Sequence, residues 1–215
     1  FLELAAAFKF ISNSDLVWEW GFFTRDVVLL IWALIFISIF IYLLLNFIKN
    51  KKSKNSFGII ISLLSLVFGI YLFSGLFGYK IHGLVESYLP PPQEDSEWIE
   101  DLDYAFEIAK NENKLIFIDF TGYTCTNCRW MEINIFELPE VESLFQDYVL
   151  VKLYTDGKEP KHSKNRMMEI ERFKTAALPF YVILNYDDQV ISTFPGMDTN
   201  KYNFIDFLTL AKEKQ

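Results

Sequence analysis

The sequence predicts a hairpin of two membrane-spanning α-helices followed by a globular α/β domain. Two long apolar stretches occupy the first half of the chain, and the second half alternates between helix-type and strand-type patterns. The charge divides at the same point: residues 1–93 hold 7 Lys/Arg and 5 Asp/Glu, whereas residues 94–215 hold the remaining 13 and 23. The first part therefore has a net charge of +2 and the second of −10. This acidic balance argues against a nucleic-acid partner.

The two apolar stretches have the length of transmembrane helices. Residues 27–45 contain no charged side chain, and residues 57–79 form a second apolar run that includes several glycines. About 20 apolar residues in a helix cross the roughly 30 Å hydrocarbon core of a bilayer. Transmembrane helices are therefore expected at about 27–46 and 57–79. The alternative, a buried helix of a soluble protein, is disfavoured by the absence of charge, and a secretory signal is excluded because the runs are long and internal.

The loop between the two spans indicates their orientation. It carries the basic residues Lys49, Lys51, Lys52 and Lys54 and no acid. The positive-inside rule then makes the Lys49–Lys54 loop cytoplasmic and places both flanking segments outside.

The beginning of the chain has the character of an internal segment. Residues 1–12 form an amphipathic segment or the tail of an earlier span, and the first methionine is Met131. The sequence is therefore expected to start inside a longer protein. Residues 88–96 contain three consecutive prolines, which favour an extended linker and stop a helix. The expected domains are thus a membrane region, 1–93, and a second domain, 94–215.

The second domain is expected to follow the order α, β, α, β, α, β, β, α. Apolar side chains at helical spacing predict four helices, over residues 97–111, 129–136, 168–176 and 203–215. Short apolar runs predict four strands, over residues 114–120, 147–156, 179–185 and 189–196, the last two as a β-hairpin. Ser96 is the expected cap of the first helix, Pro139 ends or restarts the second, and residues 157–168 are expected to form a polar surface loop.

Both cysteines of the chain lie in one motif, Cys125-Thr-Asn-Cys128, directly after a predicted strand and at the start of a predicted helix. The first turn of a helix presents free N–H groups and a partial positive charge. These stabilise a thiolate, so Cys125 can become a nucleophile. The spacing also allows Cys128 to close a disulfide onto Cys125, and the pair can then pass two electrons through a mixed disulfide.

Other uses of the two cysteines are less well supported. A structural zinc site needs about four ligands, and the only histidines are His82 and His162. Haem attachment requires a histidine after Cys128, where Arg129 stands. A structural disulfide in a non-catalytic module stays open, although so short a loop gains little from chain entropy. No metal is expected, and no cofactor beyond a redox-active Cys125–Cys128 disulfide.

The segment KLIFIDFTGYTCTNCRWME, residues 114–132, resembles the active-site segment of the thioredoxin superfamily. Asp119 stands six residues before Cys125, where that family keeps a buried acid. Leu178-Pro179 precedes a strand and matches the family's cis-proline. The usual tryptophan before the first cysteine is replaced by Thr124. The resemblance implies a thioredoxin-like α/β domain in which helices flank a central mixed sheet.

The resemblance also implies roles for individual residues. Cys125 would be the attacking thiol and Cys128 the resolving thiol. Asp119 would shuttle protons for Cys128, or would be a buried acid satisfied by hydrogen bonds. Pro179 would be cis and shape the groove that accepts a partner strand, and Glu132 would be structural. The groove would be bordered by Tyr123, Thr124 and Leu178, although a packing role for Tyr123 is equally open.

Three further stretches narrow the resemblance. The pattern F-T-G-Y-x-C-x-N-C-R-x-M-E, the stretch LYTDGKEP and the stretch ALPFYVIL resemble the C-terminal domain of the bacterial DsbD family of thiol:disulfide interchange proteins. This implies a protein-disulfide reductase in the bacterial inner membrane, with its thioredoxin-like domain in the periplasm. An upstream membrane domain, supplied by cytoplasmic thioredoxin, would donate electrons, and periplasmic thiol/disulfide proteins would accept them. A role confined to cytochrome c maturation is the alternative. Because the spans contain no cysteine, this chain is not expected to carry electrons across the membrane alone.

Overall fold

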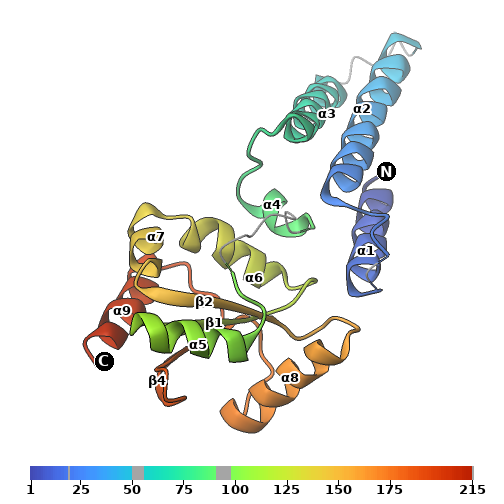
Figure 1. Cartoon of the computed structure of the whole chain (residues 1–215). Helices are drawn as coiled ribbons and strands as arrows, with labels where there is room; N and C mark the ends of the chain where they lie inside the picture. Colours follow the sequence, from blue (N-terminus) through green and yellow to red (C-terminus); the bar gives the residue numbers. More distant parts are fainter. Residues whose placement is uncertain (19, 50–55, 91–97, 215) are drawn as a thin grey trace.

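The computed structural model describes residues 1–18, 20–49, 56–90 and 98–214. An apolar group of helices stands beside an α/β domain, and a short segment connects the two (Figure 1). Several expectations fall outside the described residues: the lysines at 51, 52 and 54, the cap at Ser96, and the part of the proline-rich linker from 91 onward. The domain boundary at residues 93 and 94 therefore stays a prediction.

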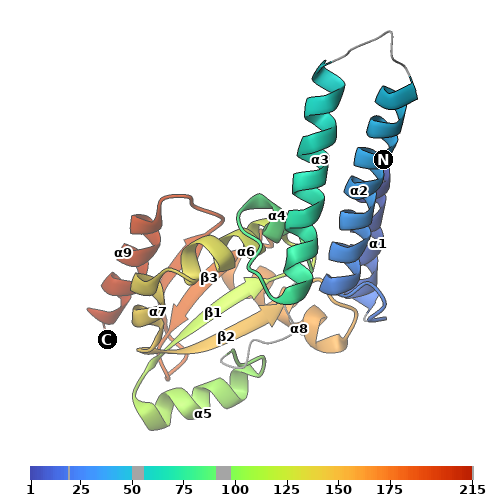
Figure 2. The same ribbon diagram turned by 90° about the horizontal axis from the view of Figure 1, so that it is seen from above.

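The two predicted spans are confirmed as helices that are long and apolar enough to cross a membrane. They are α2 (Arg25–Lys49) and α3 (Ser56–Ser74), which continues into the 3₁₀ turn η1 (Gly75–Phe77). The two helices run side by side (Figure 2). Gly69 permits their close approach, because a Cβ at this position would lie 3.1 Å from Cγ1 of Ile37.

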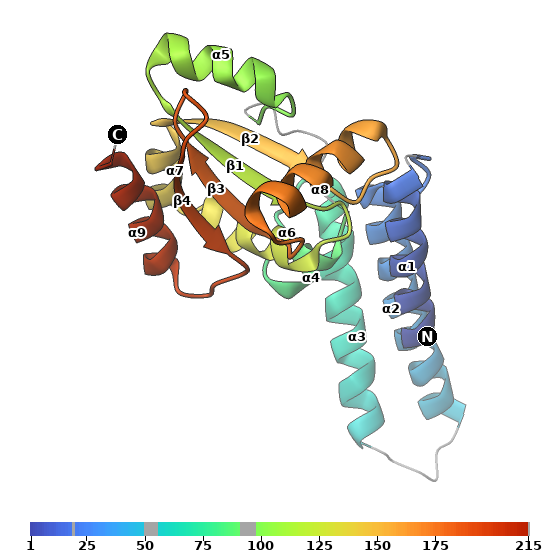
Figure 3. The same cartoon turned by 90° about the horizontal axis from the view of Figure 1, so that it is seen from below.

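The segment at the start of the chain is helical over a longer range than expected. Helix α1 (Leu2–Trp18) packs along α2 (Figure 3), where the indole Nε1 of Trp32 donates a hydrogen bond of 3.1 Å to the carbonyl oxygen of Ala5. Trp18 is half exposed at the end of α1.

A short helix connects the hairpin to the domain. Helix α4 (Leu84–Tyr88) contacts helix α6 (Thr126–Met131) of the domain. Glu86 of α4 forms a bidentate pair with Arg25 at the start of α2, with 2.6 Å between Nη2 and Oε2. Leu89, next to α4, is buried among apolar side chains of the hairpin. The hairpin and the helix that follows the cysteines are thus joined through α4.

The α/β domain contains the predicted mixed sheet. Its strands are β1 (Leu115–Thr121), β2 (Tyr148–Tyr154), β3 (Phe180–Leu184) and β4 (Val190–Pro195), in the order β2-β1-β3-β4. Strands β1 and β2 are parallel, whereas β3 is antiparallel to both β1 and β4. All four predicted strands and the β-hairpin are confirmed.

Helices cover both faces of this sheet, because alternate residues of each strand point to opposite sides. One face packs against the π-helical turn η2 (Glu132–Phe136), α7 (Pro139–Phe145) and α9 (Lys201–Lys212). The other face packs against α5 (Leu102–Glu112) and α8 (Pro160–Phe173). Pro139 restarts a helix, as one of the two predicted outcomes.

The first predicted helix of the domain begins later than expected. Its cap is Asp101, whose carboxylate accepts the backbone N–H groups of Asp103 and Tyr104. The preceding residues pair with the edge of the sheet instead: Ile99 exchanges backbone hydrogen bonds of 2.9 Å with the β2 residues Leu150 and Lys152. Sheet pairing at an otherwise open edge of β2 therefore overrides the helical spacing of these residues.

The prediction of a surface loop at residues 157–168 is wrong from Pro160 onward, and only its residues 157–159 lack regular structure. Helix α8 begins at Pro160, a residue suited to the first turn of a helix. Its inward face carries His162 and Glu169, which are both 1% exposed, together with Asn165. Because this buried face is polar, the helix lacks the apolar periodicity by which helices are recognised in sequence.

Candidate active site

The two cysteines lie where β1 passes into α6. Cys125 is the N-cap of α6, and its Sγ accepts the backbone N–H of Cys128 at 3.1 Å. The two residues form a disulfide with an S–S distance of 2.02 Å. Cys128 is fully buried, whereas Cys125 is partly exposed. This asymmetry makes Cys125 the sulfur that another molecule can reach.

The peptide bond between Leu178 and Pro179 is cis, as predicted. It lies directly before β3, and the carbonyl oxygen of Pro179 accepts the N–H of Gly196 at 2.8 Å. Pro179 is buried and Leu178 is partly exposed. The roles of these residues in a substrate groove remain predictions.

Asp119 is a fully buried residue of β1, which confirms the predicted buried acid. Its neighbours across the sheet are Lys152 on β2 and Tyr181 on β3. Burial raises the pKa of the Tyr181 hydroxyl well above its ordinary value, and the negative charge of Asp119 raises it further. Proton transfer by Asp119 remains a prediction.

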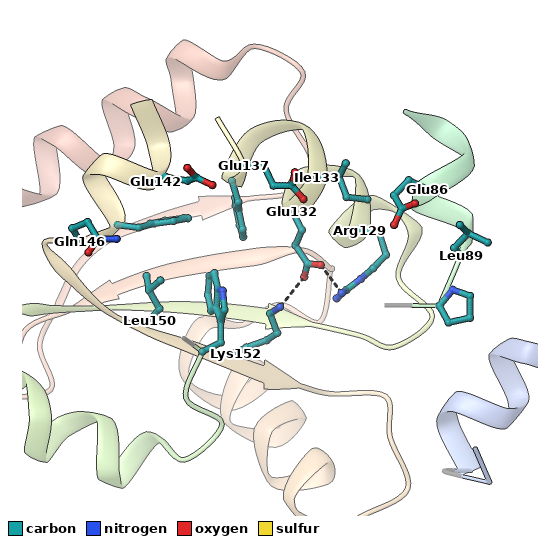
Figure 4. Close-up of a pocket in the computed structure, with 14 residues that line it drawn as sticks. Glu86, Leu89, Arg129, Glu132, Ile133, Glu137, Glu142, Gln146, Leu150 and Lys152 are labelled. Atoms are coloured by element: carbon teal, nitrogen blue, oxygen red, sulfur yellow. Dashed lines mark ion pairs between the residues drawn. The ribbon is translucent and has the colours of Figure 1, made fainter. Parts of the chain in front are cut away.

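A cluster of buried charges lies on the face of the sheet that packs against α6, η2 and α7 (Figure 4). Arg129, which follows Cys128, pairs with Glu132 and donates a 3.1 Å hydrogen bond to Oγ1 of Thr121. The Nζ of Lys152 lies 3.6 Å from Oε1 of Glu132. Burial lowers the pKa of Lys152, but the nearby negative charges, first that of Glu132, outweigh burial and raise it overall. The cation is therefore held in its charged form.

The buried cluster borders a pocket of about 420 Å³ between α4, α6, η2, α7 and β2. Figure 4 shows Glu86 and Leu89 from the α4 segment on one side of it and Leu150 from β2 on another. The sequence contains a signal for this cluster. Lys152 is the only charged residue within the otherwise apolar strand segment 148–154, so it has to find a negative partner when that strand is buried.

The loop before Cys125 is held by a second acid that sequence reasoning missed. Oδ1 of Asp156 accepts the backbone N–H of Tyr123 at 2.8 Å. Oδ2 accepts the backbone N–H of Thr124 at 3.0 Å and its hydroxyl at 2.9 Å. Asp156 follows β2, which is parallel to β1, so the residues after both strands meet at the same edge of the sheet.

Tyr123 is fixed by aromatic contacts on the same rim. Its ring stacks on that of Tyr154, with centroids 3.9 Å apart and an interplanar angle of 7°. Its hydroxyl lies 3.4 Å from Nε2 of His162 on α8. Tyr123 thus packs as well as lying next to the CxxC motif. Within the described residues, no group of three His, Cys, Asp or Glu side chains could hold a metal ion.

The comparisons with known proteins concern the second half of the chain. Residues 97–186, less than half of the chain, match the family model described as thioredoxin-like. No curated protein matches the sequence. A thioredoxin from Thermus thermophilus is 17% identical, with a TM-score of 0.47 over 55% of this chain and 88% of that one. The oxidised C-terminal domain of DsbD from Neisseria meningitidis is 18% identical, with a TM-score of 0.42 over 52% of this chain and 97% of that domain. A DsbH oxidoreductase is 14% identical, with a TM-score of 0.45 over 63% and 96% of the two chains.

The family match and the sheet topology together define a thioredoxin-like α/β domain that follows two apolar helices. A CxxC disulfide at the start of a helix in this fold is consistent with a thiol–disulfide oxidoreductase.

Proposed function

We propose that the protein is a membrane-anchored protein-disulfide reductase of the DsbD type. The observation that carries the proposal is the pairing of a reachable Cys125 with a fully buried Cys128 in one disulfide. The two membrane-length helices anchor the domain, and the lysines of the intervening loop favour its placement on the outer, periplasmic side of a bacterial inner membrane.

The reaction begins with the reduced pair. The Cys125 thiolate attacks one sulfur of a substrate disulfide, so that a bond forms from its Sγ to that sulfur and the substrate S–S bond breaks. The other substrate sulfur leaves as a thiolate and takes up a proton. Cys128 then loses its proton and attacks Sγ of Cys125, which closes the Cys125–Cys128 disulfide and releases the second substrate thiol. Two electrons have passed from the cysteine pair to the substrate.

The buried groups near Cys128 serve the second step of this reaction. A buried thiol cannot lose its proton directly to water, and Asp119, which is also fully buried, is the proposed acceptor. The Arg129–Glu132–Lys152 cluster keeps compensating charges beside the strand that carries Asp119. Because both cysteines of these 215 residues form the motif, the electrons that restore the dithiol have to come from a group outside this segment. The proposed donor is a DsbD-type membrane domain supplied by cytoplasmic thioredoxin, and the acceptors are periplasmic thiol/disulfide proteins.

The test uses the full chain in lipid nanodiscs. The reduced protein is mixed with a disulfide-containing protein substrate, and the loss of substrate disulfide is followed by thiol labelling. Cys125→Ser is expected to abolish turnover, whereas Cys128→Ser is expected to accumulate a mixed disulfide between Cys125 and the substrate, visible by mass spectrometry. The proposal is wrong if Cys125→Ser retains turnover. A reduction potential below about −300 mV without exchange would instead indicate a structural disulfide.

A further inference from the structure

We propose that Asp156 is a positioning residue for Cys125: its carboxylate holds the loop before this cysteine, and its charge sets how readily the thiol ionises. This inference rests on the proposed function in so far as Cys125 is the attacking thiol. The charged side chain acts through the loop and touches no substrate.

The carboxylate holds the loop at several points. Its two oxygens accept the consecutive N–H groups of Tyr123 and Thr124, and Oδ2 also accepts the hydroxyl of Thr124. The next residue along, Cys125, donates its own N–H to the carbonyl oxygen of Gly122 at 3.2 Å, which closes the turn. The position of Cys125 therefore depends on a turn whose two central residues are bound to Asp156.

The glycine in this turn fits the same interpretation. A Cβ at Gly122 would lie 2.8 Å from Oδ2 of Asp156, a distance that real Cβ atoms do not tolerate. The absence of a side chain at Gly122 thus lets the carboxylate reach the two N–H groups. This is a close approach of backbone and carboxylate, and it explains why the residue before Tyr123 is glycine.

The carboxylate is itself held in place by its surroundings. Thr155 donates both its N–H and its hydroxyl to the carbonyl oxygen of Thr121, at 3.0 and 3.2 Å, which ties the ends of β1 and β2 together. A Cβ at Gly157 would lie 2.1 Å from Nδ1 of His162, so this buried imidazole packs directly against the backbone after Asp156. Asp156 is therefore a fixed part of the rim.

The charge of Asp156 has an electrostatic consequence. Its bond to the N–H of Thr124 places a negative charge one residue from Cys125, and a nearby carboxylate disfavours a thiolate. The N–H groups at the start of α6 act in the opposite direction. Among the described residues, the other ionisable groups around this loop and the motif include Tyr123, Tyr154 and His162 on the rim, and Asp119, Arg129, Glu132 and Lys152 behind it. Two cations lie on the side of α1: Lys9, whose pKa is lowered by burial and by the charge of Arg129, and Lys158, which packs on the ring of Trp18. Asp156 is an acid that contacts the loop directly, through the N–H groups of Tyr123 and Thr124.

The experiment compares Asp156→Asn with Asp101→Asn in the reduced full chain in nanodiscs. Asp101 is a matched control because its carboxylate also accepts two backbone N–H groups, at the start of α5. The rate of iodoacetamide alkylation of Cys125 is measured by peptide mass spectrometry between pH 5 and 9. Asp156→Asn is expected to lower the midpoint of this profile by about one pH unit, because a neighbouring negative charge is lost. It is also expected to slow reduction of a protein disulfide about tenfold, because the loop no longer orients Cys125. Asp101→Asn is expected to change neither.

Asp156→Glu separates charge from geometry and serves if the asparagine variant is unfolded at the assay temperature. Glutamate keeps the charge, but its side chain is one methylene group longer, so its carboxylate cannot bind the two N–H groups in the same position. This variant is therefore expected to retain the alkylation midpoint of the wild type and to lose turnover. The inference is overturned if Asp156→Asn matches the wild type in both measurements, if Asp101→Asn shifts the midpoint equally, or if Asp156→Glu shifts it as the asparagine variant does. A wild type that fails to reduce protein disulfides would contradict the proposed function, whereas the alkylation profiles would still decide the role of Asp156.

Discussion

The hairpin and the α/β domain use their apolar side chains in opposite ways. In β1 all seven residues are buried inside the domain. In α2, by contrast, Leu34 and Ile41 are about half exposed, at 54% and 47%, although they lie in the middle of an apolar helix. The domain thus supplies its own apolar surroundings, whereas the hairpin leaves a large apolar surface that a lipid environment would cover.

The two regions also differ in where they place charge. No charged residue occurs between positions 27 and 48, and the paired Arg25 stands at the beginning of α2. The domain, in contrast, buries Asp119, Arg129 and Lys152 next to the cysteine motif. Burial of a charge is costly unless it is compensated. The difference fits the proposed function, in which the hairpin attaches the protein to a membrane and the domain carries the chemistry.

The largest expected effect comes from the centre of the domain. The fully buried ring of Phe117 is surrounded by the aromatic rings of Trp98, Phe136, Phe145, Tyr148, Tyr181, Phe204 and Phe207. Phe117→Ala is expected to lower the free energy of unfolding of the domain by about 3–5 kcal/mol, since it leaves a cavity. Denaturant titration of the tryptophan fluorescence measures this. Phe57→Ala, at a 67% exposed position of α3, is the control and should leave the free energy of unfolding of the domain unchanged. If both variants lose the same free energy, apolar side chains of the hairpin and of the domain do not differ in the way described.

Much of this contrast could be predicted from the sequence. The two spans, the four strands and the CxxC disulfide follow from local patterns, namely apolar length, short apolar runs and cysteine spacing. The wrong predictions concern residues whose structure depends on distant partners. Ile99 pairs with β2 rather than continuing a helix, and His162 is buried because α8 places a polar face against the rim.

The site shows the same division. Cys125 and Cys128 form the motif that identifies them, and Asp119 stands only six residues before it. Asp156 lies 33 residues from Tyr123, the first of the two residues whose N–H groups it binds, so only the parallel pairing of β1 and β2 brings it to the loop. Its position at the end of a predicted strand, 147–156, was visible in the sequence, but its contact with the loop was not.

The second prediction compares the same substitution, to lysine, at one exposed position in each region. Val67 on α3 and Tyr202 on α9 are both 65% exposed. Val67→Lys is expected to cost membrane insertion about 2.5–3.5 kcal/mol, because the charge would lie near the bilayer centre. Tyr202→Lys faces water and is expected to change stability by less than about 0.5 kcal/mol. Carbonate extraction of membranes and thermal unfolding measure the two effects. If Val67→Lys inserts as efficiently as the wild type, α3 does not face lipid at this position.

The third prediction concerns a buried acid of the domain. Its ionisation is expected to make the stability of the domain, but not that of the hairpin, depend on pH. Glu169 on α8 is 1% exposed, and burial raises the pKa of its carboxyl from 4.5 to about 7, while the charge of Arg166 opposes this increase. Between pH 4.5 and 7 the folded state therefore keeps a proton that the unfolded state has released. Stability is accordingly expected to fall as the pH rises through this window, by up to about 3 kcal/mol.

Glu169→Gln removes the ionisation and keeps the shape of the side chain. This variant is expected to lose the corresponding pH dependence and to be more stable than the wild type at pH 8, while the two differ little at pH 4.5. Chemical unfolding of the domain in the full chain at pH 4.5, 6 and 8 measures the difference. Glu171→Gln, at an exposed position two residues further along α8, should retain the wild-type profile. If Glu169→Gln keeps it as well, the carboxyl of Glu169 ionises as easily in the folded state as in the unfolded one, and the domain buries this acid without cost.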